Sequence, residues 1–258
     1  DGLGNFRRDS EALAESVNHS RRDVRGLAVS DLNNDGFVDI VSVACQSWPL
    51  DTSLMPHPAR ALVGSDFDRS AFVWMTFMQV KPANFEEGFV WSGMEPGNGT
   101  LAVEINDGAN DNSWVKIVTR GSKGLISNGS VNRDGVGAVV SFTPDGGKTV
   151  MRPVIAGSGY ASQDGKEGVF GLGKGKSGTI DVLWPGGKRN RLYNVHSAEN
   201  IVFHEIPCSY NDAISFKEYR NCVSDTLDEL ENAGVVNQQQ KTRFLFSAIR
   251  AFKDARKE

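Results

Sequence analysis

Short stretches of alternating apolar and polar residues, separated by turns rich in glycine and proline, fill much of the chain before its last fifty or so residues. A period of two is typical of strands that bury one face of a sheet. The clearest stretches are 26–30, 37–43, 139–142, 149–151 and 180–184. The turns 144–148 (Pro-Asp-Gly-Gly-Lys) and 185–188 (Pro-Gly-Gly-Lys) are of the kind that joins antiparallel neighbours, so we expect hairpins there.

The pattern changes to a helical period after this β region. One helical face carries five apolar residues, Phe244, Leu245, Ala248, Ile249 and Phe252. An earlier helix is predicted over 225–233, with Ser224 as its N-cap and Gly234 as its end. Ser215 and Glu218 also have the spacing of a helix capping box. We therefore expect a helical extension at the end of the chain.

The segment between the first two predicted strands is rich in oxygen-bearing side chains. They stand at alternate positions around Gly36, and they are Asp31, Asn33, Asp35 and Asp39. Ca²⁺ takes about six to eight oxygen ligands, and side chains spaced in this way fold inward toward one ion while a backbone carbonyl adds a further ligand. The sequence predicts a Ca²⁺ site with these four side chains and the Phe37 carbonyl as ligands, and Gly36 permits the tight backbone.

This segment differs from an EF-hand. An EF-hand requires a bidentate Glu at the twelfth position, which is Ser42 here, and a helix on each side. The flanks 26–30 and 37–43 are strand-like instead, and in that context the segment resembles the FG-GAP repeat of integrin-type β-propellers. A hairpin turn without metal is the alternative, because Asn and Asp favour turns on their own.

Composition and charge narrow the class of partner. The chain has 258 residues, with 28 Gly, 14 Phe and 5 Trp, which suits one large all-β unit or two domains. A net charge of −4 gives no electrostatic footprint for nucleic acid or an anionic membrane. The apolar stretch 71–80 is too short and too interrupted for a membrane span. We expect a protein or glycan partner, no nucleic acid and no membrane span.

Several features suggest an extracytoplasmic location: secreted, periplasmic or in an organelle lumen. Extracellular fluids hold calcium at concentrations that weak sites can use. Cys208 and Cys222 bracket a short polar segment and can pair, which would leave Cys45 as a buried thiol in a strand. Because the chain starts at Asp1 without a signal peptide, we expect a processed or truncated product. Three glycosylation patterns, relevant only in a eukaryotic secretory pathway, begin at Asn18, Asn98 and Asn128.

Five ordered motifs carry the most specific resemblance. They are 106–117 (NDGANDNSWVKI), 130–138 (SVNRDGVGA), 157–163 (GSGYASQ), 169–173 (VFGLG) and 182–187 (VLWPGG). They resemble the ASPIC/UnbV domain, and with the FG-GAP-like segment before them the chain is similar to the cartilage acidic protein-like family. Glycines beside aromatic residues such as Trp114, Tyr160 and Trp184 favour architectural roles for these motifs.

The resemblance covers roughly residues 1–46 and 100–206, and together with the pattern of the rest of the chain it predicts a mainly β fold in four parts. These are a propeller-type FG-GAP blade with the calcium loop (1–46), an insertion with a β-hairpin (47–99), an ASPIC/UnbV-like antiparallel sandwich or barrel (100–206), and the helical extension (207–258). A propeller usually needs about four to eight blades, so one blade leaves open edges. Either upstream blades have been removed, or the insertion or another polypeptide covers the edge.

Signatures of catalysis are weak. The segment 173–177 (GKGKS) lacks the first glycine of a phosphate loop and precedes a predicted strand. No nucleophile motif is present. The four histidines lack the spacing of a zinc pair and are His19, His57, His196 and His204. Carboxylate pairs remain available to a hydrolase, such as Glu86 with Glu87 and Asp66 with Asp68.

Two further polar segments admit alternative interpretations. The turn 106–111 could hold a second ion or be an ordinary Asx-rich turn. Arg133, between Asn132 and Asp134, could bind a carboxylate or phosphate, or form a salt bridge within the domain.

Taken together, these patterns predict a non-catalytic, calcium-stabilised binding or assembly module outside the cytosol. In it, Ca²⁺ would make rigid the loops that contact a protein or glycan partner. One alternative is a structural subunit of a larger complex that docks through its helical tail. Another is a hydrolase acting on a saccharide or other polar substrate with unassigned carboxylates.

Overall fold

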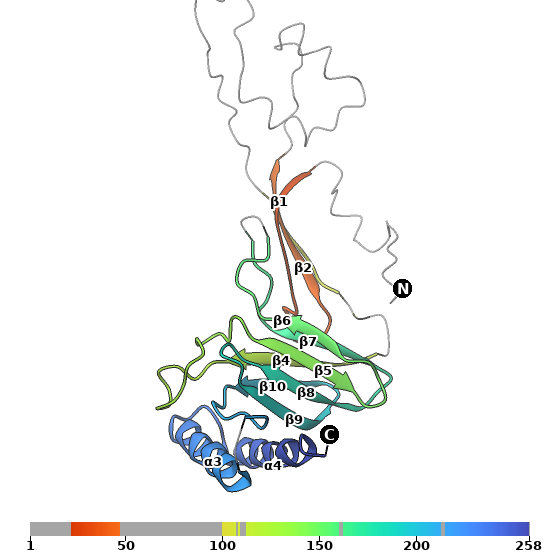
Figure 1. The fold of residues 1–258 in the computed structure, drawn as a ribbon. Coiled ribbons are helices and arrows are strands. Elements are labelled where there is room, and N and C mark those ends of the chain that lie inside the picture. The colour runs from red at the N-terminus through yellow and green to blue at the C-terminus, as the bar shows by residue number, and fades with distance from the viewer. Residues whose placement is uncertain are drawn as a thin grey trace, which may run out of the picture. The chain divides into compact units, whose positions relative to one another are not determined.

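The computed structural model describes residues 22–46, 100–106, 108, 112–159, 162–212 and 215–257. Over these residues the protein is mainly β, with three sheets followed by two helices (Figure 1). The chain divides into two compact units, one of residues 1–27 and 41–104 and the other of residues 28–40 and 105–258. The predicted division into four parts stays a prediction, and the expected insertion at 47–99 lies outside the described residues.

The first sheet contains the two strands expected around the acidic segment. Its order is β1 (Arg22–Ser30), β2 (Asp39–Gln46) and β3 (Thr100–Glu104). A propeller blade is a four-stranded sheet, and three strands are described here, so the predicted FG-GAP blade is not confirmed. The segment that joins β1 to β2 belongs to the second unit, which contains the core described below.

Two further sheets build the second unit. One has the order β10-β4-β7 and the other β6-β5-β8-β9. Their bounds are β4 Ser113–Arg120, β5 Val139–Pro144, β6 Val150–Pro153, β7 Gly168–Gly173, β8 Ser177–Leu183, β9 Arg189–His196 and β10 Glu199–His204. The rings of Phe142 in β5 and Phe170 in β7 lie 5.7 Å apart, so the sheets pack face to face. Among the described strands, neither sheet closes into a barrel.

Both predicted hairpins are present, but one strand pairing differs from the expected antiparallel pattern. β5 pairs antiparallel with β6, and β8 pairs antiparallel with β9. β10 instead runs parallel to β4, with Ile201 opposite Ile117. The chain leaves β9 through a short turn at Ser197 and Ala198, and it then continues in the other sheet beside β4 rather than folding back on β9. The prediction of a wholly antiparallel domain was therefore wrong at this pair.

The helical extension is confirmed, and its first helix begins at the expected Ser215 cap rather than at Ser224. α3 spans Phe216–Asn232, and its N-cap is Ser215, whose side chain accepts a hydrogen bond from the Glu218 N–H. Ser224 is an interior residue of this helix, so the start predicted there was wrong. The end is close to expectation, because Gly234 follows with a φ of 72°. α4 spans Gln238–Asp254 with an Asn237 capping box. Within the described part of the chain, no helix has the length and apolarity of a membrane span.

The helices complete the core rather than standing apart from it. In Figure 1 both lie at the end of the second unit that holds β9 and β10. The Phe244 ring of α4 meets Phe203 of β10 with ring centroids 5.3 Å apart, and Phe252 stacks on Tyr219 of α3. Phe244 and Phe252 are buried, so the apolar face predicted for α4 faces its own domain.

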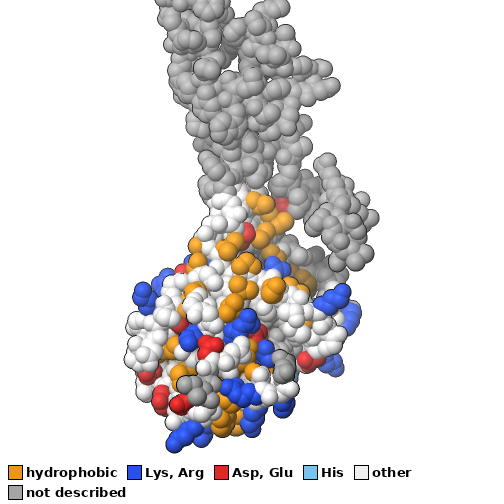
Figure 2. All heavy atoms as spheres, in the orientation of Figure 1, with side chains coloured by type: hydrophobic (Ala, Val, Ile, Leu, Met, Phe, Trp, Pro, Cys, Tyr) orange, Lys and Arg blue, Asp and Glu red, His pale blue; other side chains and the backbone are white. Residues whose placement is uncertain are grey.

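A disulfide joins Cys208 to Cys222 of α3, which resolves the pairing that the sequence left open. It links the segment after β10 directly to the first helix. The surface of this unit mixes charges: Figure 2 shows Lys and Arg side chains spread over the visible face of the described residues, with Asp and Glu side chains among them.

Candidate metal centre and the cavity beside it

The 31–39 segment, here called the acidic loop, is closed by hydrogen bonds to two buried carboxylates. Asp31 and Asp39 are 4% and 0% exposed. Asp31 Oδ1 accepts the Asp35 N–H at 3.1 Å, and its Oδ2 accepts the Gly36 N–H at 3.2 Å. Asp39 Oδ2 accepts the Leu32 N–H at 2.7 Å. Each carboxylate therefore draws backbone from the other side of the loop toward itself.

The other two predicted side-chain ligands lie together at the tip. The Asn33 amide donates to Asp35 Oδ2 at 2.7 Å, and Asp35 Oδ1 accepts the Phe37 N–H at 2.8 Å. The Phe37 ring packs against Gly108, where an added Cβ would lie 2.4 Å from a ring carbon. The acidic loop thus gathers Asp31, Asn33 and Asp35 through hydrogen bonds.

Strand β4 supplies the floor under the acidic loop. Residues two apart on a strand share one face, so Trp114 and Lys116 point the same way while Val115 and Ile117 enter the core. The Trp114 ring lies so close to Gly36 that an added Cβ would be 1.9 Å from it. Gly36 also has a φ of 86°, so both the close approach and the backbone conformation require glycine here.

Among the described residues, Lys116 is the cation that contacts the predicted ligands. Its Nζ lies 3.1 Å from Asp31 Oδ2, 3.1 Å from the Asp31 carbonyl oxygen and 2.8 Å from Asn34 Oδ1. The residue is only 7% exposed. Nothing in the sequence around the acidic loop identified this lysine, because it comes from a strand distant in the chain; the alternating pattern of 113–120 alone hinted at a charged residue on a half-buried face.

The donor set of the acidic loop suits a hard divalent cation. It offers three carboxylates and one amide, and carboxylate oxygens that accept one hydrogen bond keep further acceptor capacity. Three carboxylates against one ammonium leave a net negative charge for an ion to balance. Among the described residues, no three His, Cys, Asp or Glu side chains converge into a metal cluster, so the fit depends on the amide and on a backbone carbonyl as well.

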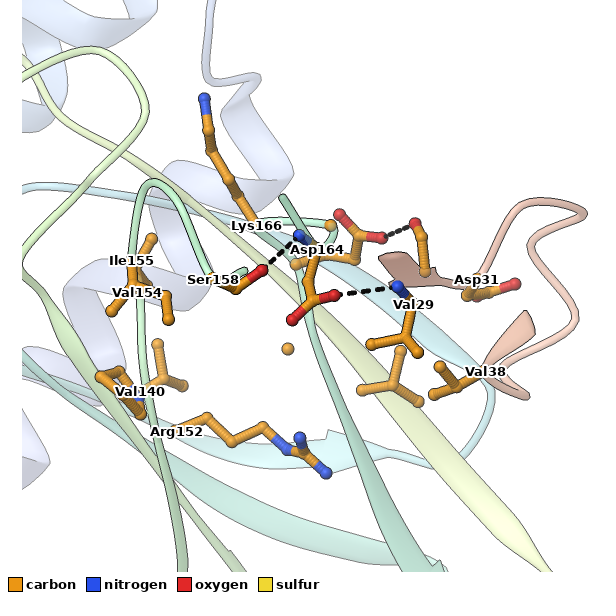
Figure 3. Close-up of a pocket in the computed structure, with 16 residues that line it drawn as sticks. Val29, Asp31, Val38, Val140, Arg152, Val154, Ile155, Ser158, Asp164 and Lys166 are labelled. Atoms are coloured by element: carbon orange, nitrogen blue, oxygen red, sulfur yellow. Dashed lines mark hydrogen bonds between the residues drawn. The ribbon is translucent and has the colours of Figure 1, made fainter. Parts of the chain in front are cut away.

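A cavity of about 240 Å³ lies directly beside the acidic loop. Figure 3 shows Val29, just before the acidic loop, and Val38, near its end, on one side and Val140, Val154 and Ile155 on the other. Val38 and Ile155 are 39% and 49% exposed, so apolar surface is open to solvent here. The cavity therefore has apolar walls, and residues at both ends of the acidic loop contribute to one of them.

The acidic residues at this cavity form hydrogen bonds within the protein, whereas Arg152 forms no salt bridge with the described residues. Asp164 Oδ1 accepts the Val29 N–H at 2.9 Å, and Glu167 accepts the Ser30 hydroxyl, so both acids hold the end of β1. Arg152 extends across the cavity in Figure 3, with its Cζ 5.7 Å from the Phe170 ring centroid. Arg152 forms no salt bridge with any residue that the structure describes.

The Arg133 segment is a network within the domain. Asp134 Oδ2 accepts from Lys166 at 2.6 Å, and Arg133 Nε lies 3.4 Å from Asp134 Oδ1. The hydrogen bond from Lys166 is the main cause that lowers the pKa of Asp134 below its ordinary value. Arg133 itself is 88% exposed. The intradomain salt bridge, the alternative left open for this segment, is therefore present.

Other candidate residues are dispersed or lie outside the description. His204 is 8% exposed, its Nδ1 has no hydrogen-bond partner among the described residues, and burial together with the nearby Arg120 charge lowers its pKa to about 4. Asn128 is exposed, and β8 follows the 173–177 segment as expected. The carboxylate pairs at 66–68 and 86–87, most of the 106–111 turn, Tyr160 and the first two histidines fall outside the described residues.

One site escaped sequence reasoning entirely. Glu205 is fully buried and accepts hydrogen bonds from Ser122, Ser130 and Val131, including the Ser122 hydroxyl at 2.6 Å and the Ser130 hydroxyl at 2.7 Å. Burial alone would raise the pKa of Glu205, but these donors outweigh burial and hold it below the ordinary value. We call these four residues the Glu205 cluster. No local motif marks it, because its donors and acceptor are far apart in the chain.

Comparisons with known proteins support part of the resemblance expected from the motifs. Residues 128–208 match the family described as ASPIC and UnbV. Cartilage acidic protein 1 of Homo sapiens is 24% identical over 240 residues, covering 69% of this chain and 35% of that protein. The Xenopus tropicalis protein of the same name is 24% identical over 227 residues, with 64% and 34% covered, and the Mus musculus protein is 23% identical over 240 residues, with 69% and 36% covered. The chain thus spans about a third of the length of these relatives. An FG-GAP repeat is not shown, and the family match at 128–208 lies within the second unit.

Proposed function

We propose that the chain is a non-catalytic, calcium-stabilised, extracytoplasmic module that contacts a protein or glycan partner beside its acidic loop. Asp31, Asn33, Asp35 and Asp39 would hold the ion together with the Phe37 carbonyl. A bound Ca²⁺ would supply a cross-link between the two strands that the acidic loop joins. Its role in this proposal is to hold shape.

One observation carries the proposal: the acidic loop is at once the predicted ion site and a wall of the open cavity. Val29 lies two residues before the first predicted ligand, Val38 lies between the last two, and both line the cavity. An ion that fixes the acidic loop would also fix that wall, because the ligand side chains and the wall residues share one short backbone. Rigid walls lower the entropy that is lost when a partner binds.

The cavity has the chemistry of a contact site. Exposed apolar side chains at Val38 and Ile155 lie with Arg152 around one hollow. Arginine beside apolar surface is a frequent anchor at protein interfaces, and its planar guanidinium also binds carboxylates. A partner segment that carries an apolar group next to a carboxylate would satisfy both features.

The location outside the cytosol is supported by the Cys208–Cys222 disulfide. Disulfides persist in oxidising compartments and are rare in reducing ones. The curated relatives are named for cartilage and for acidity, which agrees with an extracellular setting and with the negative charge of this chain. These relatives are much longer, so their name supports an extracellular setting but identifies no partner for this chain.

The two alternatives gain less from the structure. Docking through the helical tail would need a free apolar face, whereas Phe244 and Phe252 of α4 are buried in their own core. A hydrolase would need acids free to act at a cavity, whereas Asp164 and Glu167 each bond the end of β1. Both acids are accounted for by a structural role.

The calcium part is tested by calorimetric titration and by thermal melting with and without a chelator. The wild type should release or absorb heat with one equivalent of Ca²⁺ and should melt at a higher temperature with the ion than with chelator. Asp35→Asn keeps the size of the side chain and should abolish both effects. Asp212→Asn, an exposed acid elsewhere in the second unit, should change neither. A wild type with no heat and no shift in melting would exclude the calcium role.

The contact part is tested with two immobilised baits. Arg152→Ala removes the cavity arginine, and Lys148→Ala removes an exposed cation from the β5–β6 turn. A partner identified with the wild type should remain on the Lys148→Ala bait and be lost from the Arg152→Ala bait. Equal retention on both would place the contact elsewhere.

A further inference from the structure

The buried ammonium of Lys116 in β4 is surrounded by oxygen atoms of the acidic loop. Three oxygens surround its ammonium at 2.8 to 3.1 Å, two from Asp31 and one from Asn34. At 7% exposed, the charge has little water to replace these contacts. A buried ammonium persists only where oxygens and an opposite charge surround it. The acidic loop supplies both.

The acidic loop is shaped to receive this cation. Asn34 has a φ of 62°, a left-handed conformation that Asn tolerates, and it turns its Oδ1 to 2.8 Å from Lys116 Nζ. Asn34 is not one of the predicted calcium ligands. The acidic loop around Gly36 therefore contains two sets of oxygen atoms. One has the spacing of Ca²⁺ ligands, and the other binds the ammonium of Lys116.

Asp31 belongs to both sets. Its Oδ2 lies 3.1 Å from Lys116 Nζ, and the spacing of the acidic loop makes it the first predicted ligand of the ion. Like charges that share one carboxylate repel each other, and they do so more strongly where water is scarce. Occupation of Asp31 by one cation must therefore weaken its hold on the other.

We propose that Lys116 is an internal cation of the acidic loop, which holds Asp31 when calcium is absent and competes with calcium for it. The inference rests on the proposed calcium function and adds a residue that sets the affinity. A built-in competitor places the site toward the weak end of calcium binding, in the range that extracellular modules use, roughly 10⁻⁴ to 10⁻³ M. It also keeps the cavity wall folded at low calcium.

The test compares Lys116→Met with Lys148→Met, a matched change at an exposed lysine. Methionine is unbranched and only one atom shorter than lysine, and it carries no charge. Lys116→Met should bind Ca²⁺ at least about tenfold more tightly than the wild type, since the competing charge is gone. In chelator it should melt several degrees lower than Lys148→Met, and saturating Ca²⁺ should restore most of that loss.

A second variant keeps the test valid if Lys116→Met folds poorly. Asn34→Gly removes the nearest oxygen from the ammonium, retains every predicted calcium ligand and suits the left-handed backbone. It should tighten calcium binding by a few fold. Unchanged affinity in both variants would overturn the competition, and unchanged melting in chelator for Lys116→Met would overturn the holding role.

The outcomes separate this inference from the calcium proposal. If the wild type binds Ca²⁺ and Lys116→Met binds it equally well, the inference fails while the calcium proposal stands. If the wild type binds no Ca²⁺ and Lys116→Met does, the lysine has fully replaced the ion, so the inference stands and the calcium proposal fails. If neither protein binds Ca²⁺, both fail.

Discussion

The acidic loop and the Glu205 cluster solve the same problem by different means. Each buries a carboxylate in the second unit, with Asp31 4% exposed and Glu205 fully buried. Asp31 forms an ion pair with the ammonium of Lys116 and accepts hydrogen bonds from backbone N–H groups. Glu205 is met by hydroxyl and backbone donors of the Ser122–Val131 turn, and no described cation forms a salt bridge with it.

The difference bears on the proposed exchange of one cation for another at Asp31. A lysine ammonium on a flexible stem can move away when another cation arrives. Backbone N–H groups cannot, because moving them unfolds the turn that carries them. The Glu205 cluster is therefore a fixed anchor, while in our proposal the acidic loop contains a charge that Ca²⁺ replaces. Variants of each should separate these roles.

The largest effect is expected from Glu205→Ala. It leaves several buried donors of the 122–131 turn without an acceptor, which should reduce the free energy of unfolding by about 3 to 5 kcal/mol. Glu229→Ala is the matched control, because Glu229 accepts from the N–H and hydroxyl of Ser127 in the same turn but at the surface. Urea unfolding should show a much smaller loss for the control. Equal losses would mean that Glu205 is no special anchor.

Acid should lower the free energy of unfolding through His204, the neighbour of Glu205. His204 is neutral in the fold with a pKa of about 4, below the unfolded value of about 6.5. The unfolded chain therefore binds a proton that the fold excludes, so stability is complete above pH 6.5 and falls toward pH 4, by about 3 kcal/mol in total. The lowered pKa of Glu205 extends the loss to still lower pH.

His204→Gln should flatten this dependence between pH 7 and pH 4.5. Carboxylates that titrate in the same range are common to both proteins and cancel in the difference. Unfolding free energies measured at the two pH values would check it, and parallel curves for the two proteins would contradict the assignment to His204.

The smallest effect compares two glycines of almost equal conformation. Gly36 in the acidic loop and Gly124 in the turn of the Glu205 cluster have φ values of 86° and 83°. An added Cβ meets Trp114 at Gly36 and nothing within 4 Å at Gly124. Alanine should cost about 1 kcal/mol at Gly124 from backbone strain and about 1 to 3 kcal/mol more at Gly36 from the clash. Melting of the two variants gives the difference, and equal losses would show that the acidic loop shifts freely off β4.

Features set by neighbouring residues were predictable. The turn at 185–188 follows from its own residues, because Gly186 and Gly187 can take the positive φ values of 89° and 88° that it requires. The register of the acidic loop is equally local, and its Asx-type hydrogen bonds follow from the spacing of Asp31, Asn33 and Asp35.

Features that join distant segments were not predictable. Ser215, with Glu218 three residues later, and Ser224 both have the chemistry of an N-cap, and the packing of Tyr219 and Val223 in the core shows that one helix runs from the first past the second. The parallel pairing of β10 with β4 depends on which sheet the chain enters after a short turn. Lys116 and Glu205 looked like ordinary charged residues, since their partners lie on other elements.

The link between Cys208 and Cys222 also changes what cleavage of the chain would do. A protease that cuts between the two cysteines would leave both products joined through sulfur, so the helices would stay attached to the sheets. Such a nicked protein would migrate as one band on a gel run without reductant and as two bands after reduction. Reduction of this bond therefore determines whether a cut there could release the helical segment.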